Sequence, residues 1–374
     1  MTDLGLDQKP TPWRKKAKKA QKKADAVADN RHFPCASCGA DLRYHPGEQK
    51  LACTHCGATQ DVPHIDDVAA QVENPYLDHL KNDTKMAEIE VQSLNCNTCG
   101  ASVEFNPDEH SRLCPFCDSA IVADVSTQRK IVPQGVLPFS VMEKQAHKHM
   151  KTWLISRWFA PNGFESAAAK EHFSGIYVPI WTYDSATTTQ YVGERGTTTG
   201  TGKNRRTRWR SVSGTVRRGF DDVLVSGTKS VSAEFKDALG PWPLRDLETY
   251  QTEFLAGLRA ENHTIGLEGG FYKAQSFMRV VITEDIRRDI GGQRQRIHSS
   301  QTRFDGQTFK HLLLPVWITH YSLGKNRYRL NVNGRTGKVY GERPFSTLKL
   351  LGASFVMTLA AMGIGLMISL ASGG

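Results

Sequence analysis

The chain has 374 residues, and its 48 lysine and arginine residues exceed its 38 aspartate and glutamate residues, which gives a formal net charge of +10. This length is too great for one compact domain, and the excess of basic residues favours anionic partners over cationic ones. All eight cysteines lie in the first third of the chain, so a disulfide framework that cross-links the whole chain is excluded.

A basic segment, residues 1–31, opens the chain, and we expect it to be a disordered tail. Seven of the ten residues from Arg14 to Lys23 are basic. Such a run can bind nucleic-acid phosphates, bind anionic lipid head groups, or simply be solvated, and composition leaves the three alternatives open. The candidate anion-binding residues are Arg14, Lys15, Lys16, Lys18, Lys19, Lys22 and Lys23.

Two copies of one cysteine pattern follow the tail. Each copy is a CxxC pair, fourteen intervening residues and a second CxxC pair. Four thiolates in this arrangement suit a tetrahedral ion and leave no open position for a catalytic water, which predicts two structural Zn²⁺ ions. Redox pairs would not come in paired sets, and disulfides would need an oxidising compartment, for which the N-terminus shows no signal peptide. The predicted ligands are Cys35, Cys38, Cys53, Cys56, Cys96, Cys99, Cys114 and Cys117.

The two copies form an internal repeat with an offset of 61 residues, in which Gly39 matches Gly100 and Leu42 matches Val103. We assign zinc ribbon 1 to residues 32–64, a linker to 65–92 and zinc ribbon 2 to 93–124. Residues 41–44 and 102–105 alternate in polarity and are predicted as the first strand of each ribbon. Units this small cannot bury a core, so metal binding must supply most of their folding free energy, about 10 kcal/mol or more.

Residues 125–345 are predicted to form a mixed α+β middle domain dominated by antiparallel sheet. Ser140 and Glu143 form a capping box before a helical pattern that runs to Trp158. Shorter helices are expected over 166–172 and 246–261. Residues 177–183 and 314–321 resemble each other as strands with a shared Pro-Ile/Val-Trp core, and residues 327–340 predict a closing hairpin.

A second basic stretch lies within this middle domain, between Lys203 and Arg218. Its glycines do not have the spacing of a phosphate-binding loop, so we predict a long basic hairpin loop. Arginines beside Trp209 can hold nucleic acid, lipid head groups or a partner protein, and a solvated loop is the remaining alternative. The candidate anion-binding residues are Arg205, Arg206, Arg208 and Arg210. No catalytic motif is recognisable elsewhere, so we predict that the chain is not an enzyme.

Residues 350–371 form a run of twenty-two residues without a charge. Roughly 20 apolar residues can cross the hydrocarbon core as a helix, which predicts one C-terminal transmembrane helix in contact with membrane lipid. Lys338, Arg343 and Lys349 flank this run on its N-terminal side. The positive-inside rule then predicts a single-pass, tail-anchored protein of the inner membrane, with the bulk of the chain in the cytoplasm.

Several segments beside the paired cysteines resemble a family of bacterial membrane-anchored zinc-ribbon proteins. They are Val136-Leu137-Pro138-Phe139, Trp158-Phe159-Ala160-Pro161, Gly175-Ile176-Tyr177-Val178-Pro179 and the hairpin from Asn333 to Pro344. Members of this family are often labelled as helicases similar to primosomal protein N′, also called replication factor Y. The resemblance implies a neighbourhood of flotillin-like or phage-shock-type proteins and a scaffold role. It does not imply helicase activity here, because this chain lacks the ATP-binding motifs.

These features together predict an α+β multidomain protein with two zinc ribbons, a mainly antiparallel middle domain and one transmembrane helix. The function we expect is that of a membrane-anchored adaptor that recruits a protein partner, flotillin-like or phage-shock-type by resemblance. The alternative is a zinc-ribbon protein that binds nucleic acid in connection with replication.

Overall fold

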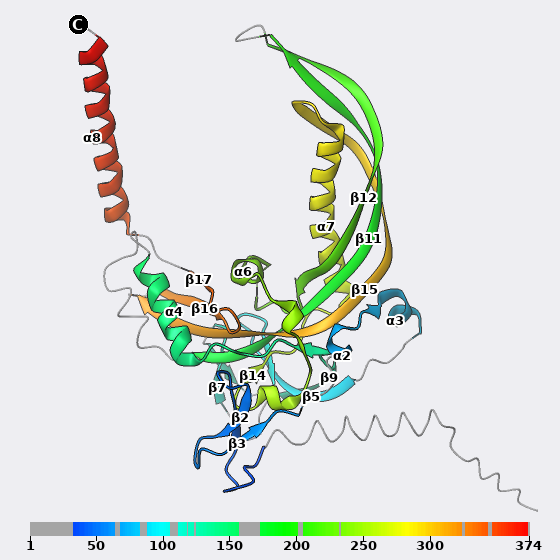
Figure 1. Cartoon of the computed structure of the whole chain (residues 1–374), viewed down its shortest axis with the longest axis vertical. Coiled ribbons are helices and arrows are strands. Elements are labelled where there is room, and N and C mark those ends of the chain that lie inside the picture. The colour runs from blue at the N-terminus through cyan, green and yellow to red at the C-terminus, as the bar shows by residue number, and fades with distance from the viewer. Residues whose placement is uncertain are drawn as a thin grey trace, which may run out of the picture.

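A computed structural model of the chain describes residues 33–63, 68–82, 88–104, 111–117, 119–122, 125–156, 173–200, 205–231, 233–323, 326–342 and 346–372 (Figure 1). The basic run from Arg14 to Lys23 and the helix expected over 166–172 lie outside these described residues.

One sheet of nine strands organises the fold, and three of its strands are much longer than the others. They run antiparallel in the order β12-β11-β15. Their sequences are rich in threonine, valine, isoleucine and aromatic residues, which pack well on a pleated surface. The three strands are β11 (Ser174–Thr199), β12 (Arg206–Ser226) and β15 (Arg294–Leu323).

Six short strands complete this sheet. β10 runs parallel to β15 and β14 runs parallel to β11, whereas the other pairings are antiparallel. The two segments that share a Pro-Ile/Val-Trp core are neighbours, with Tyr177 opposite Pro315 and Pro179 opposite Leu313. The predicted closing hairpin is confirmed as β16 and β17. The short strands are β4 (Asn74–Pro75), β10 (Gly135–Val136), β13 (Glu248–Thr249), β14 (Arg259–Ala260), β16 (Asn326–Asn333) and β17 (Val339–Gly341).

Two small groups of strands carry the cysteines, and they lie at the end of the molecule opposite to the far ends of the long strands β11 and β12 (Figure 1). The strands predicted over 41–44 and 102–105 are found as β1 and β6. The first group contains β1 (Leu42–His45), β2 (Lys50–Cys53) and β3 (Thr59–Asp61). The second contains β5 (Glu88–Asn95), β6 (Ser102–Glu104), β7 (Ser111–Leu113), β8 (Ala120–Val122) and β9 (Val125–Ile131).

Strand alternation places the two cysteine groups against opposite faces of the central sheet. Val178 and Leu314 point to the face where they share a core cluster with Cys96 and Phe116. Tyr177 points to the other face, in a cluster that contains Leu42, Tyr44 and Leu51 of the first group. Because successive side chains of a strand alternate between faces, one pair of strands supports both cysteine groups.

Helix α7 (Leu267–Ile290) packs along the concave side of the long strands and forms a hydrophobic core with them (Figure 1). Its buried residues, spaced at three or four positions, include Ala274, Met278 and Ile282, and they contact Trp181 and Tyr183 of β11 in one core cluster. We call this unit of β11, β12, β15 and α7 the arm. The arm extends away from the core, and only β11 and β12 continue past the end of α7.

The other helices are shorter or lie at the end of the chain. The predicted capping box is displaced, since α4 begins at Glu143, Met142 N donates to Gln145 Oε1 at 2.8 Å, and Ser140 Oγ donates to Arg335 O. The helices are α2 (Val68–Gln71), α3 (Tyr76–Asn82), α4 (Glu143–Ile155), α6 (Ala233–Leu239) and α8 (Thr347–Ser372), with 3₁₀ turns η2 (Leu244–Asp246) and η3 (Thr252–Leu255).

The predicted fold class is wrong in two respects. The described chain is mostly β-sheet, organised by one large and largely antiparallel sheet, and it is not an α+β multidomain protein. The helix expected over 246–261 is replaced by two 3₁₀ turns and two short strands, and Gly257 has φ +74°, which a helix does not allow. Conversely, α7 was missed, because glycines near its start and the β-branched run from Val280 to Thr283 lower helix propensity.

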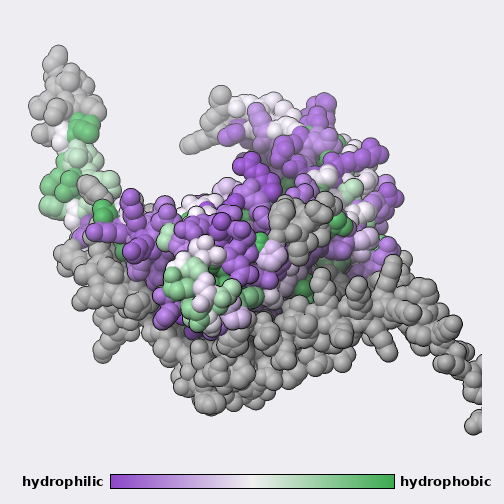
Figure 2. Space-filling view, turned by 60° about the horizontal axis from the view of Figure 1, so that its bottom comes forward, coloured by the Kyte–Doolittle hydropathy of each residue, from purple (hydrophilic) through white to green (hydrophobic). Residues whose placement is uncertain are grey.

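The predicted membrane anchor is also corrected. Among the described residues, no helix is both long and apolar enough to cross a membrane. A helix does form over residues 350–371, as part of α8. The prediction of a single-pass, tail-anchored inner-membrane protein is therefore overturned. Apolar side chains of α8 such as Phe355 are exposed (Figure 2).

Candidate metal centres and basic arm

The predicted cysteines converge into two groups of four, as their spacing required. In each group, the four sulfur atoms all lie within 4.8 Å of one another, so each group could hold a metal ion. The Sγ atoms of Cys35 and Cys56 are 3.6 Å apart, and those of Cys96 and Cys117 are 3.5 Å apart. The two predicted ligand sets are therefore brought together by the fold.

Each first CxxC pair is shaped by a tight turn. Cys35 N donates to Ala40 O and Cys96 N donates to Ala101 O, both at 2.8 Å. The turns require positive φ at Gly39 (75°) and Gly100 (73°), a conformation that glycine adopts without strain. The repeated glycine-alanine pair after each first CxxC is thus explained by turn geometry.

Hydrogen bonds to sulfur favour the thiolate form that metal ions require. Backbone N–H groups of Cys56 and His55 lower the pKa of Cys53 to about 6. Burial acts to raise the pKa of Cys96, but hydrogen bonds from the Ser119 hydroxyl and from nearby backbone bring it down to about 6. The lowered pKa values are confined to some thiols of each group, because burial and neighbouring sulfur atoms raise the pKa of Cys38 in the first group and of Cys99 and Cys114 in the second.

The two cysteine groups share one burial pattern but differ in the exposure of their turns. The first cysteine of each CxxC pair is buried in both groups, whereas the second is exposed in the first group (Cys38 and Cys56) and half-buried in the second (Cys99 and Cys117). Phe116, between the last two cysteines of the second group, is 1% exposed, whereas His55 at the matching position of the first group is exposed. The cysteine turns of the second group are therefore packed more closely into the core than those of the first group.

Polar contacts fasten the second group to the central sheet. His320 Nε2 lies 2.9 Å from Phe116 O, and Arg329 Nη1 donates to Ser230 O at 3.2 Å and to Phe116 O at 3.5 Å. Asn262 N donates to Ser102 O at 2.8 Å, beside the bridge between Val103 and Glu261. The second ribbon is therefore joined to the central sheet through its second cysteine turn and to the loop after β14 through β6.

Glu261 is a buried carboxyl group at this junction, 2% exposed. Thr228 Oγ1 donates to its Oε1 at 2.5 Å, and Ser230 Oγ donates to its Oε2 at 2.8 Å. Burial raises its pKa to about 8, although the two hydroxyls and Arg329 oppose the shift. The carboxyl group is thus protonated near neutral pH while it holds two loop residues beneath the ribbon.

The first group is attached through Tyr44 of β1. Its backbone N–H donates to Ala256 O at 2.9 Å, and its hydroxyl donates to Phe139 O at 3.3 Å. Its ring meets Phe254 edge-on, with centroids 5.5 Å apart. Phe139 in turn contacts Tyr177 of the sheet, so the first ribbon reaches the sheet through a chain of buried aromatic rings.

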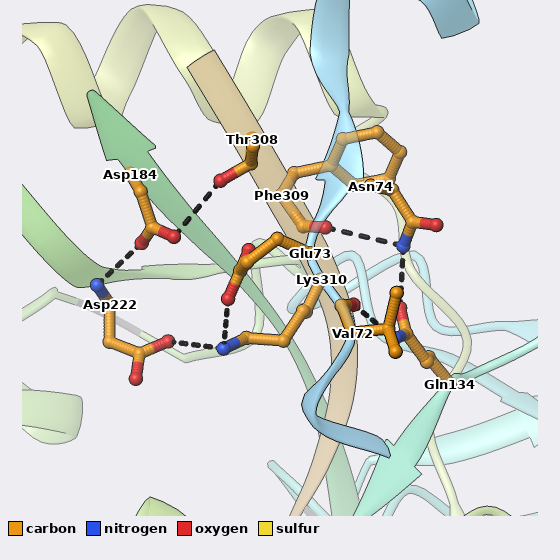
Figure 3. A network of polar contacts seen from close by, with 9 residues as sticks. All are labelled: Val72, Glu73, Asn74, Gln134, Asp184, Asp222, Thr308, Phe309 and Lys310. Atoms are coloured by element: carbon orange, nitrogen blue, oxygen red, sulfur yellow. Dashed lines mark hydrogen bonds and ion pairs between the residues drawn. The ribbon is translucent and has the colours of Figure 1, made fainter. Parts of the chain in front are cut away.

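A charged network ties the segment between the ribbons to the sheet (Figure 3). The ammonium group of Lys310 on β15, 7% exposed, pairs with Glu73 and, at 2.9 Å, with Asp222 Oδ1. Asp184 accepts from Asp222 N at 2.6 Å and from Thr308 Oγ1 at 2.9 Å. Oxygens of the three carboxylates lie within 4.8 Å of one another, but Lys310 already occupies the space among them. The network is an internal ion pair that positions β4 rather than a metal site.

The arginines predicted in a basic loop lie instead on or beside a strand. Arg206, Arg208 and Arg210 belong to β12, opposite Thr199, Thr197 and Arg195 of β11. All three are exposed, and residues spaced by two share one face of a strand. Arg205 precedes the strand and is also exposed, whereas Lys203 lies outside the described residues. We call Arg206, Arg208 and Arg210 the arginine row; hydrophilic residues cover most of the arm in Figure 2.

The arginine row has no carboxylate partner among the described residues, a property that it shares with Arg217 of β12 but not with several other arginines of the arm. Arg218 donates to Asp285 at 3.0 Å and Arg303 donates to Asp305 at 2.8 Å. The row therefore adds uncompensated positive charge at the outer end of the arm. Residue pattern alone could not identify Arg218 as paired, because its partner Asp285 lies 67 residues away in the sequence.

Sequence reasoning missed two functional features of the core, namely Glu261 and Lys310. Glu261 ends the helix predicted over 246–261 and Lys310 precedes the strand predicted over 314–321, so both look like ordinary surface positions in the sequence. The signal that could have found Lys310 is its place in the run from Phe309 to Tyr321, which is otherwise almost entirely apolar. No comparable signal marks Glu261.

Comparison with known proteins gives one weak relationship. The chain is 23% identical over 329 residues to the uncharacterized protein YdjG of Bacillus subtilis (strain 168), which covers 85% of this chain and 91% of that protein. No family model matches the chain. No solved structure matches it either.

Proposed function

We propose that both cysteine groups hold Zn²⁺ in a structural role. Four thiolates are the ligand set that zinc prefers, and a tetrahedron with Zn–S bonds of about 2.3 Å has sulfur–sulfur distances of about 3.8 Å. The distances of 3.5 and 3.6 Å between paired sulfurs fit this geometry closely. All four positions are cysteine, so no position is left for a water or a substrate.

We further propose that the chain is a non-catalytic adaptor that recruits a protein partner through the arm. The observation that carries this proposal is the arm itself, which projects from the zinc-stabilised core and ends in the unpaired arginine row. The second ribbon is a poor docking surface, because Cys96, Cys114 and Phe116 are buried against the sheet. In this proposal, the ribbons stabilise the core from which the arm projects.

Binding of nucleic acid is the second candidate, favoured by Trp209 within the arginine-rich segment. The ring of Trp209 is already engaged, however, since the Arg296 guanidinium lies 3.9 Å from its centroid. It also packs against the backbone of Gly196, where an added Cβ would come within 2.9 Å of the ring. A base could stack on Trp209 only by displacing Arg296, so the protein partner remains the better supported proposal.

A crosslinked pull-down from cells tests the adaptor, with nuclease-treated and untreated halves. The full chain is compared with a variant whose β11–β12 hairpin is shortened beyond Thr197 and Arg208. We expect the same partner protein in both halves with the full chain, and its loss with the shortened arm. Recovery that disappears with nuclease would instead support nucleic-acid binding. Retention of the partner by the shortened variant would refute the role of the arm.

A further inference from the structure

β12 forms one border of the central sheet along its whole length. Its only strand partner among the described residues is β11, from Ile180 opposite Ser226 to Thr199 opposite Arg206. Every second residue of a border strand directs its backbone N–H and C=O groups away from the sheet. Those groups can accept an added strand, as in recognition of extended peptides by strand addition.

The arginine row gives this border a repeating charge pattern. Its three side chains recur every second residue, which corresponds to about 6.8 Å along an antiparallel strand. They share the face of Arg195, whose guanidinium donates to Ile290 O at the end of α7. The row therefore lies at and beyond the last turn of α7, where the helix no longer covers the strands.

Carboxylates of α7 restrict the proposed binding surface to the outer end of the arm. Nearer the core, Asp285 of α7 neutralises Arg218, and Asp289 accepts from the Tyr191 hydroxyl beside Gly214. An acidic ligand would meet these carboxylates if it moved toward the core. A second copy of the chain is also disfavoured, because pairing two β12 borders in this region would bring arginines close to arginines.

We propose that the outer border of β12 binds an extended acidic segment of a protein partner by strand addition. Acidic side chains at alternate positions of that segment lie opposite Arg206, Arg208 and Arg210, while its backbone pairs with the free backbone groups of β12. This inference rests on the proposed adaptor function and names the class of partner that the arm recognises.

The two-residue spacing of the arginine row matches the repeat of a β-strand, and this match favours a peptide over a nucleic acid. An added strand has the same two-residue period as β12, so each carboxylate meets one guanidinium in register. Arginine suits this contact because its planar fork can bind a carboxylate through two parallel hydrogen bonds. A polynucleotide would use the charge of the row but not the unpaired backbone groups of the border.

Fluorescence anisotropy with the full-length, zinc-loaded protein tests this surface. The probes are a labelled peptide of alternating Glu and Thr, a peptide of the same composition with its Glu residues in one block, and an oligothymidylate. A fourth probe is the alternating peptide with N-methylated backbone at every second residue, which keeps the charge but cannot form the strand hydrogen bonds.

We expect the alternating peptide to bind more tightly than the other three probes. Combined replacement of Arg206→Ala, Arg208→Ala and Arg210→Ala should weaken its binding roughly ten-fold, because three exposed ion pairs are lost together. The matched control is Arg217→Ala, an exposed arginine of β12 that is opposite Thr188 and outside the row. It should leave the affinity within about two-fold of the parent protein.

Four results would overturn the proposal. Equal binding of the N-methylated peptide would exclude strand addition, and tighter binding of oligothymidylate would assign the surface to nucleic acid. An equal loss of affinity in the Arg217→Ala control would show that binding depends on the overall positive charge of the arm and not on the arginine row. Failure of the peptide assay, with partner capture still lost when the arm is shortened, would refute this inference and leave the adaptor function intact.

Discussion

Replacement of Glu261 by glutamine should change how the stability of the protein depends on pH. Glutamine keeps the size of the side chain and can still hydrogen-bond to Thr228 and Ser230, but it cannot ionise. In the parent protein, burial raises the pKa of Glu261 from 4.5 to about 8. The folded state therefore keeps a proton that the unfolded chain has already released.

The direction of the effect follows from that difference in bound protons. Between pH 4.5 and about 8 the folded state binds one more proton than the unfolded state, so stability falls as pH rises through this window. The difference of about 3.5 pH units between 4.5 and 8 corresponds to roughly 5 kcal/mol at 1.36 kcal/mol per unit. About 3.5 kcal/mol of this develops between pH 5 and pH 8.

Urea unfolding of the zinc-loaded protein at pH 5 and pH 8 measures the effect. The difference in unfolding free energy between the parent and Glu261→Gln should be small at pH 5 and should favour the variant by about 3 kcal/mol at pH 8. Zinc affinity also changes with pH, but it changes equally in both proteins. Exposed Glu268→Gln on α7 is the matched control and should run parallel to the parent. Parallel curves for Glu261→Gln and the parent would refute the reasoning.

Three further predictions concern the core. Cys96→Ser should lower bound zinc from two ions to one and lower the melting temperature more than Cys35→Ser, because the second cysteine group holds the buried Phe116 in the core, whereas His55 at the matching position of the first group is exposed; metal analysis and circular dichroism measure both. Lys310→Met should destabilise the protein by about 3–5 kcal/mol, since it leaves paired carboxylates without a cation, and adding Glu73→Gln should recover part of this loss in chemical unfolding. Phe139→Ala should cost about 3–5 kcal/mol in the same assay, because its ring is fully buried; a loss below 1 kcal/mol would contradict this packing.

Short-range features were predictable from the sequence because their chemistry is local. Four cysteines at fixed spacing define a ligand set wherever the ribbon is placed, and the glycine after Cys38 identifies its turn. The ribbon strands and α4 follow the same logic, since the alternation of side chains and the spacing of apolar residues act over a few positions. The capping residue of α4 was misplaced, because Ser140 finds a distant acceptor at Arg335.

Long-range features were not predictable in the same way. The outer reach of the arm depends on β12, whose arginine-rich half looks like a loop until β11 pairs with it over residues 180–199. The helix α7 forms despite weak local propensity because its buried stripe packs on Trp181 and Tyr183.

The sequence by itself determined the two groups of four cysteines, because the turns that hold them close within a few residues. Only the tertiary structure decided that the cysteine turns of the first group are more exposed than those of the second, since their sequences share the same pattern. It also decided which arginines are paired, because carboxylates such as Asp285 reach them across the arm from another element. Burial and pairing depend on contacts between segments far apart in the chain, and no local pattern encodes them.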